Sequence, residues 1–171
     1  MRLYLPDVLQ YDDFDCGISC MQGICAYYGE DINEVKLIRK IRPSRQNGTC
    51  ISDITDFFLR KGYKVKAGSM TISDLKKYLN KKIPVILLLQ AWGNKDTNYE
   101  TTQAFGHYVI AIGYDSKRIL FEDPAIFGTG YLTYNSLKKR WHGLDGELRI
   151  QYGIAVFGKP PFNFKSPIKI K

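Results

Sequence analysis

One change in the spacing of apolar residues, at Pro84, constrains the fold of this chain more than any other feature. Before Pro84, apolar side chains recur every three or four residues, as they do on the buried face of a helix. After Pro84, they gather in short runs rich in Val, Ile, Phe and Tyr, which is typical of buried strands. Helices first and an antiparallel sheet afterwards predict a single α+β domain.

The same pattern predicts the individual elements. The expected helices span residues 16–28, 33–38, 52–61, 73–79 and 136–141, and the expected strands span 84–90, 107–113, 118–122 and 152–157. Asp15 and Asn33 precede two of these helices as N-cap residues, and Gly29 and Gly62 follow helices as stop signals. Residues 113–117 are expected to form a hairpin loop between two strands.

The net charge of +8 is unevenly distributed. Residues 159–171 hold four lysines, three prolines and no acid, so we expect a domain over 1–158 followed by a basic tail or linker over 159–171. The other charges are dispersed, and no arginine-rich face or aromatic platform for RNA is present. Nucleic-acid binding is therefore not expected, whereas an acidic peptide would be attracted by this charge.

The four cysteines are expected to be reduced thiols. They are Cys16, Cys20, Cys25 and Cys50. The first three share one short helical segment, where neighbouring cysteines pair poorly as disulfides. Their spacing matches no common zinc pattern, and the chain has only two histidines to complete a site. We therefore expect neither a metal nor an organic cofactor.

No apolar run approaches the roughly 20 residues that a membrane-spanning helix requires. The longest run covers residues 85–89 and suits a buried strand. The N-terminus is too short, and too soon interrupted by Pro6, to be a signal peptide. These observations predict a soluble, cytoplasmic protein without a membrane span of its own.

Cys16 is the candidate nucleophile, because it begins the first expected helix. A helix N-terminus presents free N–H groups and a partial positive charge, which stabilise a thiolate. Gly17, the next residue, would let a substrate carbonyl approach the backbone without meeting a Cβ. The carboxylate of Asp15 opposes the thiolate charge, unless its capping role outweighs that effect. The alternative for Cys16 is a buried structural cysteine.

Three further side chains are expected to join Cys16. His107 opens a strongly apolar strand, so it lies at the edge of the sheet, where it can face the helix N-terminus. Asp123 ends the next strand, so a hairpin returning from His107 brings its carboxylate near the imidazole. Gln10 precedes Cys16 by six residues, and a loop of that length can fold its amide back beside the sulfur as an oxyanion donor. A surface histidine and an Asp-Pro turn are the alternatives for the first two.

A set of ordered motifs surrounds these residues. The motifs are Gln10, Asp15-Cys16-Gly17-Ile18-Ser19-Cys20, Tyr27-Tyr28-Gly29, Gly106-His107-Tyr108-Val109, Asp123-Pro124-Ala125 and Ser136-Leu137-Lys138-Lys139-Arg140-Trp141. In this combination the chain resembles the bacteriocin-processing peptidases of the C39 type, which act on double-glycine leader peptides. The resemblance extends from about Gln10 to Gly143, most of the chain.

The resemblance implies a papain-like fold, in which an N-terminal helical part carries the nucleophile and packs on an antiparallel sheet carrying the histidine and the aspartate. It implies a Cys16/His107/Asp123 triad with Gln10 in the oxyanion hole, and a peptide or protein substrate cut after Gly-Gly. In the best-known members such a domain precedes a membrane-embedded ATP-binding exporter, so an exporter is a candidate partner. The chain is then a stand-alone relative or the N-terminal domain of a longer protein.

Two other functions use the same residues. A papain-like acyl transferase would pass the acyl group to an amine instead of water. A non-catalytic C39-like domain would only hold a peptide, but such domains typically lack the cysteine, so Cys16 favours catalysis. Residues 90–105 are longer than the usual connection before the histidine and are expected to wall the cleft. The second histidine, His142, is expected to be structural or on the surface.

Overall fold

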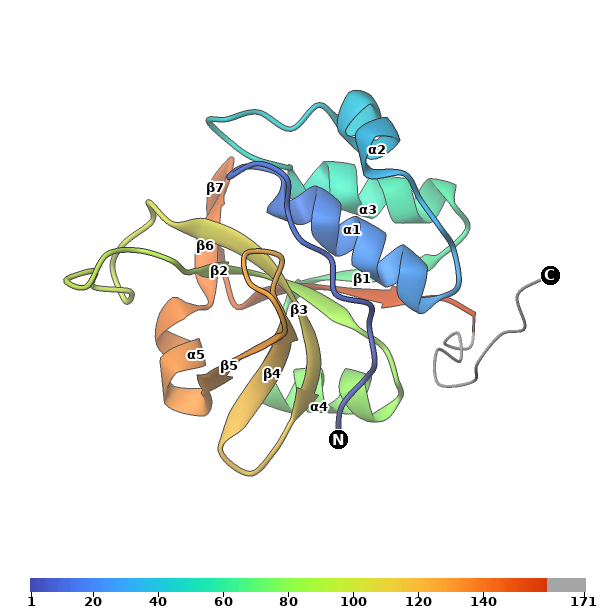
Figure 1. The fold of residues 1–171 in the computed structure, drawn as a ribbon. Helices are drawn as coiled ribbons and strands as arrows, with labels where there is room; N and C mark the ends of the chain where they lie inside the picture. Colours follow the sequence, from blue (N-terminus) through green and yellow to red (C-terminus); the bar gives the residue numbers. More distant parts are fainter. Residues whose placement is uncertain (160–171) are drawn as a thin grey trace.

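The computed structural model of the protein describes residues 1–159, so all but the first residue of the predicted tail lies outside the described part. Figure 1 shows helices on both faces of one central sheet. α1 (Cys16–Tyr27), α2 (Glu34–Ile41) and α3 (Ile51–Arg60) pack on one face. α4 (Ile72–Asn80) and α5 (Tyr134–Arg140) pack on the other. None of these helices is long and apolar enough to cross a membrane.

The sheet has six strands in the order β1-β8-β2-β3-β4-β5, and a separate two-stranded hairpin pairs β6 with β7. The strands are β1 (Lys64–Ser69), β2 (Val85–Gln90), β3 (Gly106–Tyr114), β4 (Arg118–Glu122), β5 (Thr129–Thr133), β6 (His142–Asp145), β7 (Glu147–Ile150) and β8 (Tyr152–Phe157). Every pairing is antiparallel. The predicted α+β class with an antiparallel sheet is confirmed, and each of the four expected strands is present.

Four strands were not expected from the sequence: β1, β5, β6 and β7. β1 lies between α3 and α4, so the predicted order of helices followed by strands is wrong at this point. β1 and β5 form the two edges of the sheet and are partly exposed, so neither carries the continuous apolar run that marked the buried strands. Lys64 and Lys66 in β1 are the kind of residues that keep an exposed edge from pairing with another chain.

The helix ends agree with the capping prediction at three of four positions. The Asn33 side chain accepts a hydrogen bond from the Lys36 N–H and so caps α2. Gly29 and Gly62 have φ values of +83° and +84°, the left-handed conformation that ends a helix. Asp15 occupies the N-cap position of α1, but its side chain makes no capping hydrogen bond. The predicted capping role of the Asp15 carboxylate is therefore wrong.

The first ten residues run from the C-terminal end of β3 to the turn after β4, and then lead into α1. The backbone N–H of Leu3 donates to the Ile112 carbonyl at 2.6 Å, and that of Val8 to the Glu122 carboxylate at 3.4 Å. The N–H of Gln10 donates to the Pro124 carbonyl at 2.9 Å. This segment therefore ties the residues before α1 to the turn that follows β4.

Candidate active site

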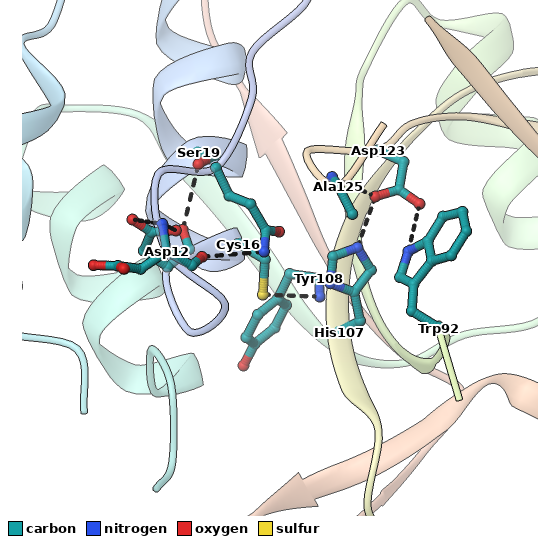
Figure 2. Close-up of polar contacts among 10 residues, drawn as sticks. Asp12, Cys16, Ser19, Trp92, His107, Tyr108, Asp123 and Ala125 are labelled. Atoms are coloured by element: carbon teal, nitrogen blue, oxygen red, sulfur yellow. Dashed lines mark hydrogen bonds and ion pairs between the residues drawn. The ribbon is translucent and has the colours of Figure 1, made fainter. Parts of the chain in front are cut away.

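Cys16 is the first residue of α1, and its side chain is buried. The backbone N–H of Tyr108, in β3, donates to Cys16 Sγ at an N···S distance of 3.4 Å. Figure 2 shows the sulfur directed from the helix towards the strand that carries His107. The first N–H groups of a helix have no partner within it, and no side chain caps this end. The N-terminus of α1 therefore keeps its donors and its partial positive charge for a group beside Cys16.

The Asp15 carboxylate points back along the chain instead of into the helix. Both of its oxygens accept from the backbone N–H of Asp12, at 3.1 and 3.2 Å. Burial raises the pKa of Asp15 above its ordinary value of 3.8. Both effects lessen the opposition to a Cys16 thiolate that the sequence suggested.

Gly17 has a packing role that the sequence did not reveal. A Cβ at this position would lie 2.7 Å from the Thr49 Cβ, which no ordinary contact allows. Thr49 is buried and belongs to the loop that precedes α3. Gly17 therefore makes room for this loop, a reason for a glycine that is independent of the predicted approach of a substrate carbonyl.

His107 is the second residue of β3, and it lies at the end of an interior strand of the sheet. Its Nε2 forms a hydrogen bond with Asp123 Oδ1 at 2.7 Å, and both side chains are buried. Nδ1 is then the ring nitrogen left for Cys16. Burial lowers the pKa of His107, but the hydrogen bonds with Asp123 and Cys16 outweigh it and raise the pKa to about 9.

Asp123 follows β4 directly, one residue beyond the cross-strand pair Ile110–Glu122. Its Oδ1 accepts from the Ala125 N–H at 2.9 Å in addition to His107. Its Oδ2 accepts from the indole N–H of Trp92 at 3.2 Å. Figure 2 shows these three donors around one carboxylate. The sequence pointed to Asp123 and His107 through consecutive strands, but nothing in it indicated Trp92.

Gln10 is half-buried, and its side chain is held close to the start of α1. Its Nε2 donates to the Asp12 carbonyl at 3.1 Å, while its Oε1 is buried without a partner in the described chain. A side-chain amide carries two N–H donors, so one remains available after the bond to Asp12. The structure thus brings Cys16, His107 and Asp123 together, and orients Gln10 through Asp12.

Cys16 lines a groove of about 580 Å³. Other walls come from Cys50 at the start of α3, Leu88 in β2, Tyr108 in β3 and Leu144 in β6. A concave site of this size can hold a few residues of an extended peptide. Within residues 1–159, no group of three or more His, Cys, Asp or Glu side chains is arranged to hold a metal ion.

His142 lies apart from these residues and has a local structural contact. Its Nε2 forms a hydrogen bond with the carbonyl oxygen of Tyr99 at 2.8 Å. Tyr99 belongs to the connection between β2 and β3, so His142 anchors the middle of that connection to β6.

Comparison with known proteins agrees with this architecture. Residues 5–145 match the sequence profile of the Peptidase C39 family, and the chain belongs to that family. It is 26% identical over 165 residues to the Lactococcin-G-processing and transport ATP-binding protein LagD of Lactococcus lactis. It is 24% identical over 144 residues to the Colicin V secretion/processing ATP-binding protein CvaB of Escherichia coli. These matches cover 95% and 84% of this chain but only 20% and 18% of the relatives, so the chain spans about a fifth of their length.

Solved structures of the family share the fold. The peptidase domain of Streptococcus ComA, a bi-functional ABC transporter, superposes with a TM-score of 0.65 at 17% identity, covering 92% of this chain and 99% of that domain. A putative C39-like peptidase from Bacillus anthracis gives a TM-score of 0.67 at 16% identity, covering 90% and 94%. A double glycine motif protease solved with its leader peptide gives 0.66 at 16% identity, covering 92% and 94%.

The hydrogen bond between His107 and Asp123 predicts that the His107 imidazolium persists to about pH 9. Because this pKa exceeds the ordinary value of 6.5, the stability it contributes is complete below that value and is lost as the pH rises through about 9. An NMR titration of the His142→Gln protein, which retains one imidazole, measures it directly. Asp123→Asn removes the carboxylate charge and should lower the pKa of His107. An unchanged His107 pKa in that variant would contradict the pairing.

Proposed function

We propose that this domain is a cysteine peptidase that cuts a leader peptide after a pair of small residues, Gly-Gly first, with Cys16 as nucleophile. The observation that carries the proposal is the arrangement around His107. One ring nitrogen is bound to Asp123 at 2.7 Å, and Cys16 lies on the other side at an uncapped helix N-terminus. A buried imidazole between a thiol and a carboxylate is the arrangement that thiol acyl transfer requires.

The reaction follows from these positions. His107 Nδ1 holds the proton that Cys16 gives up, since the His107 imidazolium persists to about pH 9, and the Cys16 thiolate attacks the carbonyl carbon of the substrate peptide bond. The negative oxygen that forms accepts from the Cys16 backbone N–H and from the second Nε2–H of Gln10. Asp123 keeps the Nε2 proton on the ring and stabilises the imidazolium. His107 then protonates the leaving amine. The neutral ring next takes a proton from water as the water oxygen attacks the thioester, which releases the acid product and restores the Cys16 thiolate beside the His107 imidazolium.

The specificity and the partner are suggested by the relatives. One structural neighbour is a double glycine motif protease of a transporter, and the sequence relatives are ATP-binding secretion and processing proteins. We infer a leader peptide as the substrate and an exporter as the partner, either in the same chain or as a separate protein. The net charge of +8 favours a leader with acidic residues.

The other three cysteines provide internal controls for the reactivity of Cys16. Burial raises the pKa of Cys20, and it raises that of Cys25 to about 12. Burial and the nearby carboxylates of Asp145 and Asp53 raise the pKa of Cys50. Limiting iodoacetamide at about pH 6, followed by peptide mapping, should therefore alkylate Cys16 first. Its rate should fall in His107→Ala, and equal labelling of all four cysteines would remove the basis for calling this domain an enzyme.

Substitutions should separate the roles of the two histidines. His107→Ala should lower kcat/KM by several powers of ten, because the base and the leaving-group acid are lost together. Asp123→Ala should have an intermediate effect, because Asp123 orients the ring and carries no proton in the reaction. His142→Ala should remain within a few-fold of wild type, since the one hydrogen bond given for its side chain within residues 1–159 is with the Tyr99 carbonyl, away from Cys16. A His142 variant as inactive as the His107 variant would mean that the base is wrongly assigned.

A peptide library read by mass spectrometry tests the specificity. Glycine should dominate at the two positions before the cut, and acidic residues in the leader should improve cleavage at low salt. A preference for bulky residues before the cut would reject the Gly-Gly assignment. Products that carry an added amine, when amines compete with water, would indicate an acyl transferase instead of a peptidase.

A further inference from the structure

The connection between β2 and β3 is held to the rest of the domain along its length. At its base, the buried Gln90 side chain donates to the His142 carbonyl at 3.1 Å and accepts from the Phe105 N–H at 2.9 Å. In its middle, the Arg140 guanidinium lies 3.4 Å from the ring centroid of Tyr99. An ion pair of 2.7 Å joins Lys139 to Glu100. The connection is therefore clamped to α5 and β6.

Trp92 lies at the start of this clamped connection and has a strained backbone. Its φ is +60°, a conformation that a bulky L-residue rarely adopts. A non-glycine residue in that region persists only when surrounding contacts enforce it, and such residues cluster at functional sites. Glycine would avoid the strain, so the Trp92 side chain has to supply something that glycine cannot.

The contact that the side chain supplies is with Asp123. The indole N–H donates to Asp123 Oδ2 at 3.2 Å, on the oxygen that His107 does not use. Trp92 and Asp123 also line a cavity of about 360 Å³, together with Tyr131 and Arg140. The χ2 torsion of an aspartate sets the plane of its carboxylate, and its values are broadly distributed instead of confined to one rotamer. Without the indole, Oδ2 would face this cavity with no donor among the contacts described above.

We propose that Trp92 is a positioning residue for the reaction: its indole N–H holds the Asp123 carboxylate in the orientation in which Oδ1 accepts from His107. The clamp on the 91–105 segment keeps Trp92 in its strained conformation, so this segment supports the triad in addition to lining the site. The inference rests on the proposed catalytic roles of Cys16, His107 and Asp123.

Trp92→Phe keeps an aromatic ring but removes the donor. It should lower kcat roughly ten- to a hundredfold, the range for losing one hydrogen bond to a charged group, with little change in KM. The alkaline limb of the pH–rate profile should move to lower pH, because a less well-held Asp123 no longer raises the pKa of His107 to the same degree. Trp92→Gly relieves the backbone strain at this position. It should lose at least as much activity as Trp92→Phe, without a matching fall in the unfolding temperature.

Trp141→Phe is the matched control. The Trp141 indole donates to the Tyr152 carbonyl at 2.8 Å and is buried, so this change removes the same kind of donor away from the triad. It should lower the unfolding temperature and leave the alkaline limb in place. The pKa of His107 in each variant can also be measured by NMR titration in the His142→Gln background, which needs no peptide, so failure to find a cleaved substrate counts only against the proposed function. An alkaline limb that stays in place in Trp92→Phe, or moves equally in Trp141→Phe, overturns the inference.

Discussion

The packing of α1 against β3 is the contact on which the rest of the site depends. α1 is buried along most of its length, with Ile18, Met21 and Ile24 fully inside the core. Gly23 allows the close approach, because a Cβ there would lie only 3.1 Å from Ile110 Cδ1 in β3. Burial of such side chains contributes about 1.5 to 3 kcal/mol each, so the helix has little freedom to shift. Its N-terminus is thereby held against the strand that carries His107.

When a thiol, an imidazole and several carboxylates share a buried site, each polar group needs a hydrogen-bond partner, a donor for the anions and an acceptor for the imidazolium. Asp123 receives three hydrogen bonds, from His107, Ala125 and Trp92. The neighbouring acid, Glu122, is in a different environment. Burial and the nearby Asp7 carboxylate raise the pKa of Glu122 to about 7. Burial and the second carboxylate therefore disfavour the charged form of Glu122, although the Val8 N–H donates to it.

The 91–105 connection shows how a segment outside the core can contribute to a site. Its contacts with α5 and β6 bridge residues about 40 positions apart in the chain, as between Tyr99 and His142. In the proposal made above, these contacts support Trp92, whose φ of +60° a bulky residue rarely adopts. The proposed role of this segment is then to orient Asp123 as well as to enclose the site.

The sequence by itself determined the helices and the four buried strands, because the apolar spacing that marks them is a local property. It also pointed to His107 and Asp123 as neighbours, since they lie on consecutive antiparallel strands. Only the tertiary structure decided the direction of the Asp15 carboxylate, the need for Gly17 beside Thr49, and the presence of the half-exposed strands β1, β5, β6 and β7. It alone placed Trp92 on Asp123, since the two are separated by 31 positions and two strands, β3 and β4. Contacts of that kind depend on how whole elements pack, and no local pattern of side chains predicts them.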